Sequence, residues 1–278
     1  VLGDLKPDYV DLLQALGGQI ITLGRGRGHL NILDPGEAKE GARRLQAAGY
    51  AQEAKEILAD AHGRRHTMVL ALLTILRSSP PSDREATILD RALKHLDQHH
   101  DGIPVLGDLL TVIQQGPPEV RTVALDRGND ARYREITEEL EASLIGLTSG
   151  GRLGEIFAHP TTNPMRRDAP VVYDVSAIDD SEMDLQAAVL LACWSAGFGT
   201  VNVANALADA GLEPRRHYYV ILDELWRRLC RRKHRSGGTR PVADLGYDDH
   251  HFGGMGAGRR PQGVGDESRE AQAQVGYE

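Results

Sequence analysis

Two adjacent carboxylates, Asp223 and Glu224, follow directly after the apolar run from Tyr219 to Leu222. Burying an unpaired carboxylate costs several kcal/mol, so a buried strand here must present both side chains at its tip, toward solvent, a cation or a ligand. A carboxylate oxygen is the kind of ligand that Mg²⁺ prefers, and a second carboxylate one residue on can act as a base toward water. Such a pair also occurs by chance at ordinary strand ends.

Strand signals before this pair follow the order expected of an α/β fold. Residues 1–35 read as strand, helix and strand, with Gly17 as helix C-cap, which suggests a parallel βαβ unit. In this helix, Val10, Leu12, Leu13 and Leu16 are predicted to share one face.

A further buried strand, APVVYDVS, is predicted to end at Asp174. An apolar helix over SEMDLQAAVLLACWSAG is expected to pack on the sheet, and a separate helix is predicted to end at Gly211. Since α/β sheets bind ligands beyond the carboxyl ends of their strands, the Asp4–Lys6 strand end and Asp174 are candidate site residues.

Residues 38–150 carry helix signals and few strand signals. Ser82 and Glu85 form a capping-box pattern. A helical stripe follows it, made of Ile88, Leu89, Ala92, Leu93 and Leu96. We expect a helical insertion about the size of a small domain.

Composition narrows the function classes. The net charge of −8 and an aromatic content of 5% argue against a basic or base-stacking nucleic-acid platform. Two distant cysteines do not form a disulfide framework. No apolar stretch is expected to reach the roughly 18 residues of a membrane span.

Much of the chain resembles the ATPases of conjugative transfer and type IV secretion, in the HerA–FtsK clade of P-loop NTPases. The resemblance spans about residues 1 to 227 in family order: the segment after the P-loop, RLGEIFAHPT, the strand PVVYDVSAI, and YYVILDELW as the Walker B strand. The matching positions in the first segment are Asp4, Lys6, Tyr9, Gly17, Gly18, Asn31, Asp34 and Pro35.

The resemblance implies a RecA-like core with a mainly parallel sheet. This core would comprise residues 1–37 and 151–228, with the helical insertion at 38–150. ATP and Mg²⁺ are the implied cofactors, with Asp223 as metal ligand and Glu224 orienting the hydrolytic water.

Asp4, Lys6 and Asp174 are the implied nucleotide-binding residues. Arg152 follows two glycines and is a candidate trans-acting arginine, with an ordinary surface arginine as the alternative. The implied partners are copies of the chain in a ring, secretion or conjugation subunits, and a DNA or protein substrate. The implied location is the cytoplasm or the periphery of the inner membrane.

Two departures qualify this resemblance. None of the five lysines follows a glycine, so the Gly-Lys-Ser/Thr phosphate loop is missing, and we expect a fragment that hydrolyses ATP poorly by itself. Residues 229–278 are Gly-rich and are predicted to be disordered or the product of a frameshift. The alternatives are a catalytically inactive ATPase-like scaffold, or another α/β enzyme with paired carboxylates.

Other motifs carry weaker signals. GRGRGH, from Gly24 to His29, lacks the residues of a phosphate loop and is predicted to be a hairpin-like connection. His62 and His66 have a spacing that can bind zinc, but the Glu of the zinc-protease pattern is replaced by Gly63, which favours locally hydrogen-bonded histidines. HLDQHH and YDDHH are similarly weak as metal signals.

Overall fold

The computed structural model describes residues 1–148, 151 and 153–222. Within these ranges the chain is mostly helical, with one small parallel sheet. The helices are α1 (Val10–Ala15), α2 (Ala38–Ala47), α3 (Ala51–Arg77), α4 (Asp83–His99), α5 (Leu106–Gln115), α6 (Pro118–Ala124), α7 (Asp130–Thr148), α8 (Gly154–Phe157) and α9 (Met183–Asp209). The strands are β1 (Gln19–Thr22) and β2 (Val171–Asp174).

The sheet joins segments that are far apart in the sequence. β1 pairs with β2 in parallel, from Gln19 opposite Val171 to Thr22 opposite Asp174. Residues 1–4 lie on the other side of β2, where Asp4 forms a parallel bridge with Asp174. The predicted parallel geometry is confirmed, but the two N-terminal segments are not neighbours, because β2 lies between them.

A bulge interrupts the pairing of residues 1–4 with β2. The Tyr173 N–H donates to the Val1 carbonyl (3.0 Å), and the Tyr173 carbonyl accepts from the Asp4 N–H (2.8 Å). Val1 and Asp4, the two partners of Tyr173, are three residues apart in sequence. In a regular parallel ladder the two partners of one residue are two residues apart. Gly3 accommodates the extra residue with a φ of 95°, a left-handed conformation that glycine adopts without steric cost.

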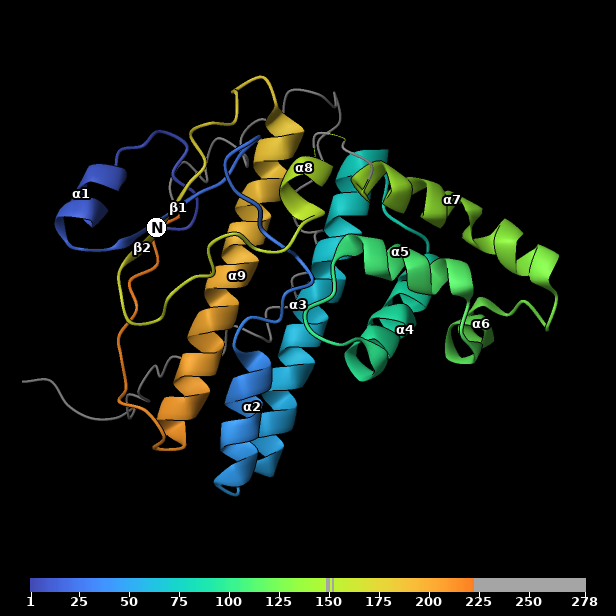
Figure 1. Ribbon diagram of the computed structural model, residues 1–278, viewed down its shortest axis with the longest axis horizontal. Coiled ribbons are helices and arrows are strands. Elements are labelled where there is room, and N and C mark those ends of the chain that lie inside the picture. The colour runs from blue at the N-terminus through green and yellow to red at the C-terminus, as the bar shows by residue number, and fades with distance from the viewer. Residues whose placement is uncertain (149–150, 152, 223–278) are drawn as a thin grey trace, which may run out of the picture. The chain divides into compact units, whose positions relative to one another are not determined.

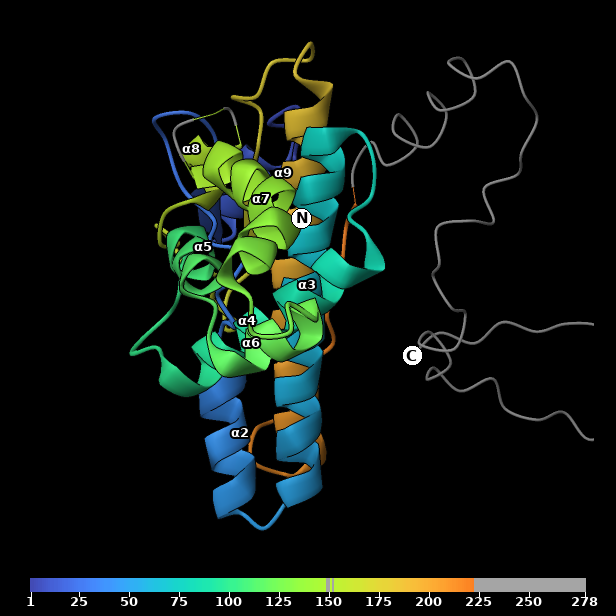
Figure 2. The same ribbon diagram turned by 90° about the vertical axis from the view of Figure 1, so that its right-hand side faces the viewer.

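The helices form two groups that meet at α3 (Figures 1 and 2). In the first, α2, α3 and α9 pack on one another; in the second, α4 packs on α5 and α6, and α5 packs on α7. One hydrophobic cluster includes residues of the strands, α3, α4, α7 and α9. The helical block and the strand-bearing segments therefore share a core, and the predicted domain boundaries stay a prediction.

Several helix predictions are confirmed. Ser82 caps α4, with its side chain accepting from the Glu85 N–H and the Glu85 carboxylate accepting from the Ser82 N–H (2.8 Å). The predicted apolar stripe of α4 is fully buried. Gly17 has a φ of 67° directly after the α1 C-cap. The predicted face of α1 is wrong, because Leu13 is buried whereas Leu12 and Leu16 are 53% and 61% exposed.

α9 is one continuous helix, where the sequence predicted two. The first predicted helix ended at Gly197, but Gly197 and Gly199 both lie within α9 and both are sites of close packing. A Cβ on Gly197 would lie 2.6 Å from the Leu2 side chain, and one on Gly199 would lie 2.7 Å from the Arg64 guanidinium. The glycines therefore permit close approach, and they do not end the helix.

α9 also overturns the expectation that no segment is long and apolar enough to span a membrane. By length and composition it qualifies, with half of its most apolar window buried. In the structure Leu185, Val189 and Cys193 are buried in the shared core. α9 thus packs as the central helix of this fold.

The segment before Asp223 is less buried than predicted. The Leu2 N–H donates to the Ile221 carbonyl (2.9 Å), and Leu222 packs against the core. Tyr219, however, is 95% exposed. Residues 217–222 form no strand, because the single hydrogen bond between Leu2 and Ile221 is not enough for a β-ladder.

We expect alanine at Gly197 and at Gly63 to change stability in opposite directions. Gly197→Ala should lower the free energy of unfolding by about 1–3 kcal/mol, because its methyl group overpacks the contact with Leu2. Gly63→Ala, in α3 with open space around it, should raise it by about 0.5–1 kcal/mol through helix propensity. Urea denaturation of both variants measures this, and equal shifts of one sign would contradict the packing role of Gly197.

Candidate functional site

Asp4 and Asp174 lie together at one edge of the sheet, at the ends of neighbouring parallel segments. Both are buried. Asp4 Oδ2 accepts from the Tyr9 N–H (2.9 Å), and Asp174 Oδ1 accepts from the Ser176 N–H (3.0 Å) and hydroxyl (2.6 Å). These bonds fix the turns that leave the strands, and the two carboxylates lie side by side at the ends of neighbouring segments. Nucleotide binding by either residue stays a prediction.

Lys6 lies just beyond this edge. It is exposed, in the turn between residues 1–4 and α1, and its carbonyl accepts from the Asp8 N–H. Lys6 thus follows the buried Asp4 by two residues. Its predicted contact with a nucleotide is untested.

Asp223, Glu224 and Arg152, the predicted metal ligand, water-orienting base and trans-acting arginine, lie outside the described residues. The described chain ends at Leu222, one residue before the pair. The hydrogen bond from Leu2 to Ile221 brings residues 219–222 alongside residues 1–4. Residues 219–222, which directly precede Asp223 and Glu224 in the sequence, therefore run beside the segment that ends in Asp4.

The two turns that follow β1 are tied to distant segments. The Gly-rich connection closes as a hairpin, with an antiparallel bridge between Gly24 and Gly28, as predicted. Arg25 contacts Glu182 (2.8 Å) and Glu155 (3.3 Å) within the chain. Asn31 donates from its amide to the Pro104 carbonyl (2.9 Å), which anchors the Asp-Pro turn to the helical block.

A pocket of about 280 Å³ lies between α3, α9 and the segments 30–37 and 161–165. Tyr173 lines it and is 1% exposed, and burial raises the pKa of its phenol. Arg64 and Asp34 are among its polar lining residues. No motif signals this pocket in the sequence, because its walls come from separate segments.

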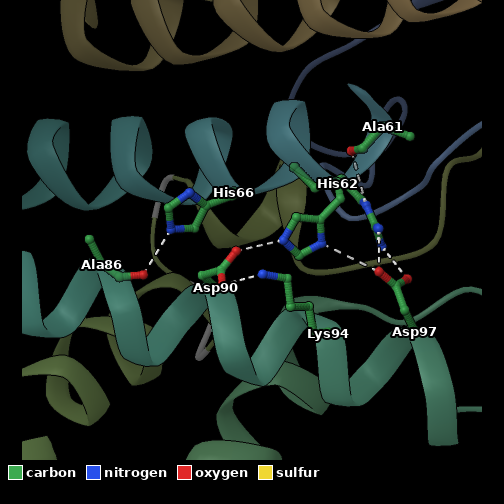
Figure 3. A network of polar contacts seen from close by, with 8 residues as sticks. Ala61, His62, His66, Ala86, Asp90, Lys94 and Asp97 are labelled. Carbon is green, nitrogen blue, oxygen red and sulfur yellow. Dashed lines mark hydrogen bonds and ion pairs between the residues drawn. The ribbon is translucent and has the colours of Figure 1, made fainter. Parts of the chain in front are cut away.

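A polar network connects α3 to α4 (Figure 3). His62 points between two carboxylates, with Nε2 2.8 Å from Asp90 Oδ1 and Nδ1 3.5 Å from Asp97 Oδ2. Arg65 donates two hydrogen bonds to Asp97 (2.9 and 2.7 Å). His66 Nε2 lies 2.9 Å from the Ala86 carbonyl oxygen. The histidines of HGRRH are hydrogen-bonded to neighbours, as the sequence favoured.

Charge pairing shifts the pKa values of this network. The hydrogen bond to Asp97 raises the pKa of His62; burial opposes this, and Asp90 adds to the increase. Burial would raise the pKa of Asp97, but hydrogen bonds from His62 and Arg65 outweigh it and hold the pKa of this carboxyl far below its usual range. The network therefore favours an imidazolium between two carboxylates.

We expect the stabilising effect of His62 to be complete below its ordinary pKa of about 6.5 and to fade as pH rises through its higher folded pKa. The folded state binds the proton more tightly, so the free energy of unfolding falls with rising pH. His62→Gln should cost about 1–3 kcal/mol near pH 6 and progressively less toward pH 9, as measured by urea denaturation. His217→Gln, at an exposed position, is the control, and a cost that is independent of pH would contradict the charged pairing.

Comparison with known proteins gives limited similarity. No protein-family model and no curated protein match the chain. Among solved structures, the chain is similar to VirB4 of Thermoanaerobacter pseudethanolicus, at 16% sequence identity and a TM-score of 0.45, over 71% of this chain and 67% of that one. A similarity of this degree carries no assignment of activity.

Proposed function

We propose that this chain is part of an ATP-hydrolysing motor of the conjugative-transfer or type IV secretion type. One observation carries the proposal: residues 1–4 and β2 end side by side in Asp4 and Asp174, and residues 219–222, which precede Asp223 and Glu224, adjoin residues 1–4. Ligands of α/β proteins bind at such an edge. The family resemblance of these segments supports the same site.

In this proposal Asp223 and Glu224 have different roles in ATP hydrolysis. Asp223 would supply a hard oxygen ligand for Mg²⁺, and Glu224 would orient and deprotonate the attacking water. Asp4, Lys6 and Asp174 would lie on the nucleotide side of the sheet edge. Arg152 would act on the nucleotide of a neighbouring copy, which makes the active form a homo-oligomer working with secretion subunits and a DNA or protein substrate.

The test is ATP binding and hydrolysis by this chain, and by a version extended with the sequence encoded upstream, which should supply the phosphate loop. We expect hydrolysis only in the extended protein. Glu224→Gln should lower its rate about 10²- to 10⁴-fold with ATP binding retained. Asp223→Asn should instead raise the Mg²⁺ concentration needed for half-maximal hydrolysis, because an amide is a weaker ligand for this ion than a carboxylate.

Glu53→Gln, at an exposed position of α3, is the matched control and should leave the rate unchanged. If the upstream sequence holds no Gly-Lys-Ser/Thr loop and neither protein binds nucleotide, Asp223 and Glu224 are an ordinary strand end. An ATPase-like scaffold would then be the better assignment.

A further inference from the structure

Three potential metal ligands converge where α4 ends and α6 begins. His95 and His99 are one helical turn apart in the last part of α4, and Glu119 lies in the first turn of α6. One ring nitrogen of each histidine and one Glu119 oxygen all lie within 4.8 Å of one another. The two helices pack together, and the neighbouring Leu96 and Val120 are buried, so the backbone holds this arrangement.

The hydrogen bonds of the two histidines suit a metal site. His99 Nδ1 lies 3.0 Å from the His95 carbonyl oxygen. A carbonyl only accepts, so Nδ1 carries the proton and Nε2 keeps a free lone pair, as in histidines that bind metals. His95 Nδ1 lies 2.5 Å from Glu119 Oε1. The two rings stack with centroids 4.2 Å apart, which keeps them on one side of α4.

The chemistry of the cluster also suits a cation. Glu119 adds a carboxylate oxygen to the two imidazole nitrogens, and the chain as a whole carries a net charge of −8.

We propose that His95, His99 and Glu119 bind a divalent transition-metal ion, with Zn²⁺ as the best match. Two imidazoles and one carboxylate are a common zinc ligand set, with the fourth position left to water. Bonds of about 2.0–2.2 Å require ligand atoms roughly 3–3.5 Å apart, so any pair near the 4.8 Å limit would have to move closer on binding. His99 is exposed, which leaves room for a small adjustment of its ring.

This site differs in chemistry from the one expected for Mg²⁺. Imidazole nitrogen favours zinc, nickel and copper, whereas Mg²⁺ and Ca²⁺ favour oxygen ligands. The proposed ion would tie the end of α4 to the start of α6. It therefore acts on the helical block, and it does not depend on the proposed ATPase activity.

The test is titration of the metal-free full-length chain with Zn²⁺ by calorimetry, and with Co²⁺ by visible absorption. We expect one ion per chain at this site, a Co²⁺ spectrum typical of tetrahedral nitrogen and oxygen ligands, and a rise in melting temperature with Zn²⁺. His99→Ala should weaken binding about tenfold or more and abolish the rise. Glu119→Gln should likewise weaken zinc binding and abolish the rise in melting temperature, and it leaves both histidine rings in place.

Other histidines provide the controls. His217→Ala removes an exposed histidine outside the cluster, and the double variant His250→Ala, His251→Ala removes the adjacent pair of the YDDHH segment. Both should bind Zn²⁺ like the unaltered chain. Loss of binding in the double variant with retention in His99→Ala would overturn the proposal, as would the absence of zinc binding by the unaltered chain.

Discussion

The close approach of α9 to residues 1–4 is the contact on which the rest of this structure depends. Gly197 admits the Leu2 side chain, Gly3 admits Leu190, and the Trp194 indole N–H donates to the Leu2 carbonyl (2.9 Å). A Cβ at either glycine would enter space that is already filled, and overpacking of this kind forces the backbone to move. Because residues 1–4 also pair with β2, their contact with α9 fixes the position of the sheet edge that carries Asp4 and Asp174.

The same helix joins the sheet to the helical block. α9 packs against α2 and α3 on its other sides, and α3 in turn meets α4 through the network centred on His62 and Asp97. Burying these charges is costly unless each has a partner. Here each charged group faces an opposite charge, so the contact favours one register between α3 and α4.

Two chemically distinct sites are proposed on this framework. The sheet edge offers carboxylates, which suit a hard ion bound with a nucleotide. The end of α4 offers imidazoles, which suit a softer ion. One site is built from strand ends that come together through the fold, and the other from one helical turn and a neighbouring helix, so substitutions in either can be interpreted separately.

The sequence by itself determined the local elements: the capping box of Ser82, the stripe of α4, the left-handed Gly17 that ends α1, and β2 ending at Asp174. These follow from interactions between residues a few positions apart. The tertiary structure alone decided that β2 lies between residues 1–4 and β1, that Gly197 is a packing site within one helix, and that Glu119 lies beside His95. Each of these depends on contacts between residues that are far apart in the sequence, and local periodicity does not predict such contacts.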